Sequence, residues 1–313
     1  MSNVQVAELA QRGVCAEPNL HGYFLMMDVL PGAEHEVRLA LMHFPELCQE
    51  LATSYPEANF SGLVGIGAGV WDRLYAMRPP LLAPFPALGV GERQMPETPF
   101  DLFFQLRGDR VDVLHLAGQR LMARLAGKVQ LREEQRGFRF LDFRDLTGFV
   151  DGTENPQGEH RAEVALVAEG QFAGGSYLHV QRYQHAMAQW QRLALKQQED
   201  TIGRTKQDNI EYASVDKPLT CHIKRVNLKD EVGNSKEILR QSMPWGTLEQ
   251  QGLYFISCCH TPEHFADMLR SMVEGDAAGH YDHLLRYTRA LTGAAFFAPS
   301  QTFLQQGGVM LTR

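Results

Sequence analysis

The sequence has little of what would place it on a membrane or a nucleic acid. No apolar run reaches the roughly 18 residues that a membrane span needs. Lys and Arg number 30 against 37 Asp and Glu, which leaves a net charge of −7. Nucleic acids and anionic membranes select clustered positive charge. The composition therefore predicts that neither a nucleic acid nor a membrane is a partner.

Cysteine is also scarce, with five residues in 313 and no C-x-x-C spacing. An odd number without paired spacing argues against a disulfide framework and against a thiolate zinc site. The first 20 residues lack the basic segment and the apolar core that form a secretory signal. These absences predict a chain without a secretion signal that works in the reducing cytoplasm.

What is present is ordinary globular material, because 44% of the residues are hydrophobic and 21% are charged. At about 150 residues per domain, the length predicts two domains. The first half follows the order β-α-β-β-α-β, with elements expected at residues 21–30, 34–53, 60–68, 100–106, 111–125 and 128–138. This order is typical of a ferredoxin-like antiparallel sheet with helices on one face.

The second half begins with a turn-rich segment at residues 145–160 and contains similar material. Strands are expected at residues 163–167, 176–183, 222–226, 238–242 and 253–258. Helices are expected at residues 184–195 and 262–274. We therefore expect an α+β protein of two ferredoxin-like domains, residues 1–144 and 145–313, each an antiparallel sheet with helices on one face.

One short motif has the letters of a zinc site without its geometry. The segment from His260 to His264 spells H-x-x-E-H, which binds zinc only when both histidines share one helix face. Thr261 and Pro262 have the character of a helix N-terminus, which places His260 before the helix. We expect no zinc here.

Three other segments carry candidate chemistry. The run at residues 148–156, GFVDGTENP, is by itself a turn after a short buried stretch. His222 stands at the start of an alternating segment, and Arg240 stands inside an otherwise apolar strand. A buried arginine must be paired or must face an anionic ligand, because an isolated buried charge is costly. The arginine therefore suggests a ligand site.

Together these segments resemble the dye-decolourising peroxidases, in particular their compact bacterial group (type B), which has no secretion signal. GFVDGTENP matches the family's G-x-x-D-G motif, His222 its proximal haem ligand and Arg240 its distal arginine. The similarity covers nearly the whole chain, including GRTK, GLYF and LTGAAFFAPS at residues 203–206, 252–255 and 291–300. It implies a haem peroxidase that binds one haem b per chain in its C-terminal domain.

The resemblance also implies roles for single residues. A haem iron needs one axial protein ligand and an open opposite face. His222 would be that metal ligand, and Asp282 would accept a hydrogen bond from its other ring nitrogen. Asp151 would move protons on the distal face and Arg240 would stabilise charge on the leaving oxygen, with the division of work between them left open. A solvated helix carboxylate is the alternative for Asp282.

Further contacts with the cofactor are expected from Gly152, Thr153, Glu154, Arg204 and Ser242. Thr153 and Glu154 would lie over the haem edge. Arg204 would pair with a haem propionate, with a surface ion pair as the alternative. Ser242 shares the strand face of Arg240 and would hold a distal water, unless it faces the surface.

The implied reaction reduces hydrogen peroxide and oxidises small organic donors, such as dyes and phenolics, in one-electron steps through an oxoferryl intermediate. Large dyes would deliver electrons through a surface Tyr or Trp that the sequence does not single out. The alternative is a haem-handling protein that stores haem or releases its iron, with incidental peroxidase activity. Chlorite dismutases resemble the expected fold but lack the GFVDGTENP run.

The resemblance further implies a homo-oligomer, at least a dimer. Some relatives are packaged in encapsulin shells through a C-terminal tail. The tail of this chain, residues 305–313 (QQGGVMLTR), contains no recognisable targeting peptide. Encapsulin packaging is therefore not expected.

Overall fold

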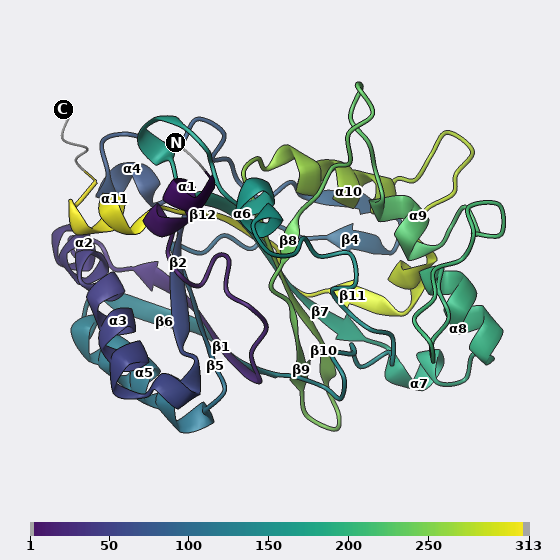
Figure 1. Ribbon diagram of the computed structural model, residues 1–313, viewed down its shortest axis with the longest axis horizontal. Helices are drawn as coiled ribbons and strands as arrows, with labels where there is room; N and C mark the ends of the chain where they lie inside the picture. The colour runs from purple at the N-terminus through teal and green to yellow at the C-terminus, as the bar shows by residue number, and fades with distance from the viewer. Residues whose placement is uncertain (1–2, 309–313) are drawn as a thin grey trace.

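The first half of the chain forms a four-stranded antiparallel sheet in the computed structural model, which describes residues 3–308 (Figure 1). Its order is β2-β5-β1-β6, the order of a ferredoxin-like fold. The strands are β1 (His21–Val29), β2 (Ser61–Gly67), β5 (Leu102–Gly108) and β6 (Val129–Phe138). One face is covered by α2 (Glu34–Met42), α3 (Phe44–Ser54) and α5 (Val111–Arg124).

The second half repeats this arrangement with strands in the order β12-β7-β10-β9. These strands are β7 (Ser176–His185), β9 (Met243–Gly246), β10 (Gln251–Cys259) and β12 (Ala294–Ala298). Two short strands extend them, β8 (Leu239–Arg240) beside β10 and β11 (Thr288–Ala290) beside β7. The helices of this half are α7 (Met187–Trp190), α8 (Leu195–Ile202), α9 (His222–Val226), α10 (Glu263–Val273) and the 3₁₀ helix η3 (His283–Arg286).

Short elements connect these parts. They are α1 (Asn3–Leu9), η1 (Pro56–Ala58), α4 (Trp71–Leu74), the hairpin of β3 (Leu88–Val90) and β4 (Arg93–Met95), α6 (His160–Ala165), η2 (Gly170–Phe172) and α11 (Gln301–Gln305). No helix within residues 3–308 is both long enough and apolar enough to cross a membrane. All five cysteines are free.

The two sheets join edge to edge into a ring, because β2 pairs with β12 and β6 pairs with β9. Gly137 faces Trp245 at the second of these seams. A Cβ atom on Gly137 would lie 2.9 Å from the ring of Phe24 and 3.0 Å from Met243, so only glycine allows this approach. The inside of the ring is an apolar core, where the rings of Phe24 and Tyr254 stack at 4.4 Å.

Strand alternation decides which side chains reach this core and which reach the helices. In β1, Phe24 and Met26 point into the ring, whereas Leu25 and Met27 pack under the helices. In the same way β7 and β10 send every second side chain outward, where Tyr183, Leu253 and Phe255 pack in one cluster with residues of α10. These outward positions of the second half build the site described below.

The α+β class and the two ferredoxin-like units are confirmed. Three predictions about short elements are wrong. Residues 163–167 belong largely to helix α6 and residues 222–226 form helix α9, whereas β7 continues to residue 185 where a helix was expected. In segments of five or six residues, apolar alternation and a helical face coincide, so periodicity could not separate them. The boundary near residue 144 stays a prediction.

Candidate active site

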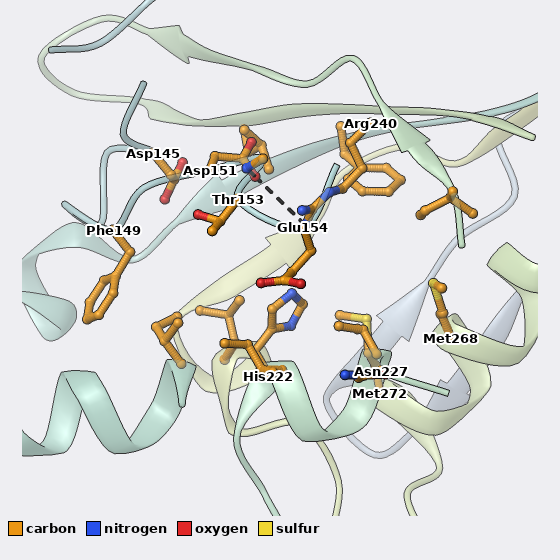
Figure 2. Close-up of a pocket in the computed structure, with 18 of the residues that line it drawn as sticks. Asp145, Phe149, Asp151, Thr153, Glu154, His222, Asn227, Arg240, Met268 and Met272 are labelled. Carbon is orange, nitrogen blue, oxygen red and sulfur yellow. Dashed lines mark hydrogen bonds and ion pairs between the residues drawn. The ribbon is translucent and has the colours of Figure 1, made fainter. Parts of the chain in front are cut away.

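A cavity of about 330 Å³ lies between the outward face of the second sheet and the helices that cover it (Figure 2). The three segments singled out by sequence meet here, because Asp151, His222 and Arg240 all line it. The rest of its wall is mainly apolar and includes Phe149, Ile202, Ile223, Val226, Ile238, Leu253, Phe255, Phe265, Met268, Leu269, Met272 and Leu284. Figure 2 shows Asp151 and Arg240 on one side of the space and His222 on the other.

His222 is the first residue of α9 and is held by a buried carboxylate. Its Nδ1 lies 2.6 Å from Oδ2 of Asp282, whose side chain is fully buried. Asp282 caps η3, where its Oδ1 accepts the backbone N–H of Leu284 at 2.9 Å. The Nε2 atom of His222 has no hydrogen-bond partner in residues 3–308, so one ring nitrogen is oriented and the other is free toward the cavity.

Asp282 was expected within a helix and instead precedes one, since η3 begins at His283. The helical form of α9 also matters for the site. Ile223 and Val226 share with His222 the side of α9 that lines the cavity. A strand would have turned alternate residues away.

The opposite side of the cavity presents the guanidinium of Arg240 and the carboxylate of Asp151. Nη1 of Arg240 lies 3.9 Å from Oδ1 of Asp151, and the two side chains are 21% and 26% exposed. The same Oδ1 accepts the backbone N–H of Gly152 at 2.8 Å. Gly152 has a φ of +80°, a conformation that residues with a Cβ rarely adopt. This turn fixes one carboxylate oxygen and leaves Oδ2 without a partner in the described chain.

Asn155 joins the Asp151 loop to the strand that carries Arg240. Its Nδ2 donates to the carbonyl oxygen of Arg240 at 2.9 Å, and its Oδ1 accepts the backbone N–H of Arg240 at 2.9 Å. Sequence reasoning missed this role although Asn155 belongs to the GFVDGTENP run. An asparagine has both a donor and an acceptor, which is what a two-way backbone contact requires.

The other expected contacts divide into two groups. Glu154 and Thr153 line the cavity, and Glu154 accepts a hydrogen bond from Nη2 of Arg204 at 3.0 Å. Arg204 is buried, also pairs with Glu211 at 3.3 Å, and its Nε has no partner within residues 3–308. Ser242 does not line the cavity, and its hydroxyl oxygen accepts a hydrogen bond from the backbone N–H of Ile256 at 3.3 Å.

A second buried pair on the cavity wall was not predicted. Nε2 of His185 lies 3.1 Å from Oδ1 of Asp145, and its Nδ1 lies 2.9 Å from the hydroxyl of Thr288. Burial opposes the charge on Asp145, but the charge and hydrogen bond of His185 and the hydrogen bonds from Thr147 lower its pKa to about 2. Burial also opposes the charge on His185, yet Asp145 raises the pKa of the imidazole above 6.5. This pair ties the start of the Asp151 loop to β7 and β11.

The Asp145–His185 pair predicts a specific pH dependence of stability. The raised pKa of His185 gives a contribution to stability that is present below pH 6.5 and is lost as pH rises through the pKa of the folded state. The lowered pKa of Asp145 gives a second contribution to stability, which is present above pH 3.8 and is lost as pH falls toward about 2. We expect Asp145→Asn to cost about 3 kcal/mol of unfolding free energy at about pH 5.5, and clearly less at about pH 9.

Urea unfolding of both proteins at the two pH values measures this difference. Asp142→Asn is the matched control, because Asp142 lies in the same segment but is exposed beside Arg144. A loss that is the same at both pH values would contradict a charged His185.

Comparison with known proteins shows which family the chain belongs to. The model for the N-terminal domain of Dyp-type peroxidases matches residues 11–139, and the model for their C-terminal domain matches residues 142–303. A dye-decolorizing peroxidase of Mycolicibacterium paratuberculosis is 39% identical over 286 residues, which cover 90% of this chain and 81% of that protein. The chain belongs to the Dyp-type peroxidase family. It is therefore a haem peroxidase, an oxidoreductase, as the resemblance of its motifs implied.

Solved structures agree with this assignment in fold. A Dyp-type peroxidase protein from Shewanella oneidensis is 57% identical, with a TM-score of 0.93 over 95% of this chain and 98% of that one. A variant of DypB from Rhodococcus jostii RHA1 in complex with haem is 34% identical, with a TM-score of 0.91 over 96% of this chain and 99% of that one.

The residues of this Dyp-type peroxidase fit a haem. The cavity offers a free imidazole Nε2 on one side and apolar walls around it. A macrocycle with carboxylate arms also needs a cation, and the buried Nε of Arg204 is a donor that the protein leaves unpaired among its described residues. No cluster of three or more His, Cys, Asp or Glu within residues 3–308 could hold a metal ion by itself. His260 precedes α10, as predicted from Thr261 and Pro262, so His260 and His264 do not share a face of this helix.

Proposed function

We propose that this Dyp-type peroxidase binds haem b through His222, reduces hydrogen peroxide in the space between His222 and Arg240, and oxidises small organic donors by one-electron steps. The observation that carries the proposal is the placement of an oriented imidazole opposite an Asp–Arg pair across one cavity. Bound haem would supply the iron that accepts peroxide and holds its oxidising equivalents. Side chains of the protein would move the protons, stabilise the developing charge and orient the iron ligand.

Asp151 is the proton carrier in this proposal. Because Gly152 engages Oδ1, Oδ2 is the atom that takes a proton from one peroxide oxygen and returns it to the other. Arg240, whose Nη1 lies 3.9 Å from Oδ1 of Asp151, stabilises negative charge on the departing oxygen. Gly152, Thr153 and Glu154 close the same side of the cavity.

On the other face Oδ2 of Asp282 accepts a hydrogen bond from the Nδ1–H of His222, which makes Nε2 a stronger ligand. Arg204 supports the proposal as a propionate partner through its unpaired Nε. For Ser242 we propose only an indirect role, since its hydroxyl is directed to Ile256.

Two further proposals concern the setting of the enzyme. Five free cysteines support a reducing cytoplasm, and the family supports a homo-oligomer. Packaging needs a direct test, because a peroxidase of Mycobacterium smegmatis that is 38% identical, with a TM-score of 0.92 over 96% of this chain and 98% of that one, was solved in encapsulated form. The end of the tail expected to lack a targeting peptide, residues 309–313, lies outside the described residues.

The proposal is tested by titrating the protein with haem, adding one equivalent of hydrogen peroxide, and then adding a small neutral phenol. We expect one haem per chain, a rapid change of the Soret spectrum with peroxide, and its return with two equivalents of phenol. Haem that binds and exchanges within minutes without any reaction with peroxide would instead support the haem-handling alternative. A cell extract fractionated by size would report packaging.

A further inference from the structure

The candidate cavity opens to solvent along one rim. Among the described residues that line it, four are exposed, and they form two pairs, Thr153 with Glu154 and Asn227 with Ser235. The second pair flanks the loop between α9 and β8. The first pair forms the turn that follows Asp151, and we call these two residues the rim turn. A group as large as a haem must pass between the rim turn and this loop.

The rim turn is attached to the rest of the protein by few contacts. It lies between Gly152, which has a φ of +80°, and Asn155, which is bound to the backbone of Arg240. The backbone of Thr153 and Glu154 makes no hydrogen bond with any residue in the range 3–308. Two hydrogen-bonded contacts, both made by side chains, therefore hold the rim turn within the described chain.

Asn209 makes the first of these contacts. Its Nδ2 donates to the hydroxyl oxygen of Thr153 at 3.0 Å, and its Oδ1 accepts a hydrogen bond from Nη1 of Arg204 at 2.9 Å. Because an arginine can only donate, the contact with Arg204 fixes which end of the amide faces Thr153. The second contact is the ion pair of Glu154 with Nη2 of Arg204 at 3.0 Å. Both contacts lead to one buried side chain, which is also paired with Glu211.

The position of Asn209 suits a contact that closes the cavity from outside. Its φ is +56°, in the left-handed region that asparagine adopts more often than most residues with a side chain. It does not itself line the cavity. The rim turn lies between Asp151 and His222 in the view of Figure 2. Asn209 thus joins this turn to the segment that leads to His222 without filling any of the space that a haem would take.

We propose that Asn209 closes the haem cavity, because its contact with Thr153 holds the rim turn in place and limits the rate at which haem enters and leaves. Opening requires the hydroxyl of Thr153 to separate from the amide of Asn209. The contact joins two groups of the protein and includes no atom of the cofactor, so its loss favours opening equally with and without haem. It therefore changes the rates of binding and release by the same factor and leaves the affinity unchanged. This inference rests on the proposed binding of haem in the cavity.

The rate of release is measured by mixing the haem-loaded protein with an excess of apomyoglobin and following the Soret band. We expect Asn209→Gly to release haem about tenfold faster, because glycine keeps the left-handed backbone but lacks the amide. Asn59→Gly is the matched control and should release haem at the rate of wild type. Asn59 also has a positive φ, +43°, and its side chain donates to Asp109, in the first half of the chain.

The affinity is compared by mixing equal concentrations of haem-loaded protein and apomyoglobin and measuring the final distribution of haem. For Asn209→Gly we expect this distribution to stay within about twofold of wild type, since the contact acts on rates alone. A general loosening of the structure would instead shift haem to apomyoglobin. Faster release with an affinity that falls by the same factor would therefore overturn the proposal, as would unchanged release.

Thr153→Val removes the same contact from its other side. Valine has nearly the shape of threonine but no hydroxyl, so this variant should also release haem faster than wild type. The double variant should be no faster than the faster single variant, because both substitutions remove one shared contact. Effects that multiply would contradict a contact between Asn209 and Thr153 as the cause. Failure of haem-loaded wild type to react with peroxide would contradict the proposed function and not this closure, because release is measured without peroxide.

Discussion

Asp151→Asn is expected to keep haem bound and to slow the reaction with hydrogen peroxide by about 10²–10⁴-fold. The amide has nearly the shape of the carboxylate and still accepts the backbone N–H of Gly152, so the loop keeps its conformation. What is lost is the oxygen that receives and returns a proton. The measurement is the rate of the Soret change on mixing with peroxide, followed over a range of peroxide concentrations.

Arg240→Leu tests the other half of the distal pair, with an expected loss of about 10²–10³-fold in the same rate. The substitution removes only a side chain, because Asn155 holds the backbone of Arg240 through both its N–H and its carbonyl. Asp142→Asn serves again as the control for a lost carboxylate outside the cavity.

The double variant decides how the two residues divide the work. If Asp151 and Arg240 act as one unit, the double variant loses little more than the stronger single variant. If they act separately, the two losses multiply. Unchanged peroxide kinetics in both single variants would contradict the roles assigned to them.

The main lines of the fold could be read from the sequence because its long elements carry a clear period. Strong patterns mark two strands, residues 21–29 and 102–108, and one helix, residues 263–273. All three were expected close to their observed bounds. The closed ring could not be predicted, because it depends on two seams. One of them, where Gly137 meets Trp245, is a single pair that no local pattern marks.

The candidate site was predictable where residues belong to a motif and not where they depend on register. Asp151, His222 and Arg240 were named from their segments, and the structure brings them to one cavity. The pairing of Asp145 with His185 depends on the extension of β7 to residue 185, where a helix was expected. Ser242 could not be placed correctly either. Strand alternation predicts which side of the strand its side chain takes, but not that its hydroxyl is hydrogen-bonded to the backbone of Ile256.

His222→Ala is expected to remove the axial ligand, so that the Soret band is lost or shifted and the reaction with peroxide disappears. The Nε2 atom of His222 is free toward the cavity, whereas both ring nitrogens of His185, the other histidine on the cavity wall among residues 3–308, are engaged by Asp145 and Thr288. Added imidazole should restore the spectrum of the variant, because it can enter the space that the side chain leaves. A haem spectrum that the substitution does not alter would place the iron elsewhere.

Asp282→Asn separates ligation from the tuning of the ligand. The amide still accepts the N–H of Leu284, but it no longer carries the buried charge that faces Nδ1 of His222. Loss of such a partner typically costs about 10–100-fold in metal affinity or activity, less than loss of the ligand itself. We therefore expect bound haem with a weakened ligand and slower peroxide reduction. If Asp282→Asn loses haem as completely as His222→Ala, the carboxylate is needed to place the imidazole; if it changes nothing, Asp282 only caps η3.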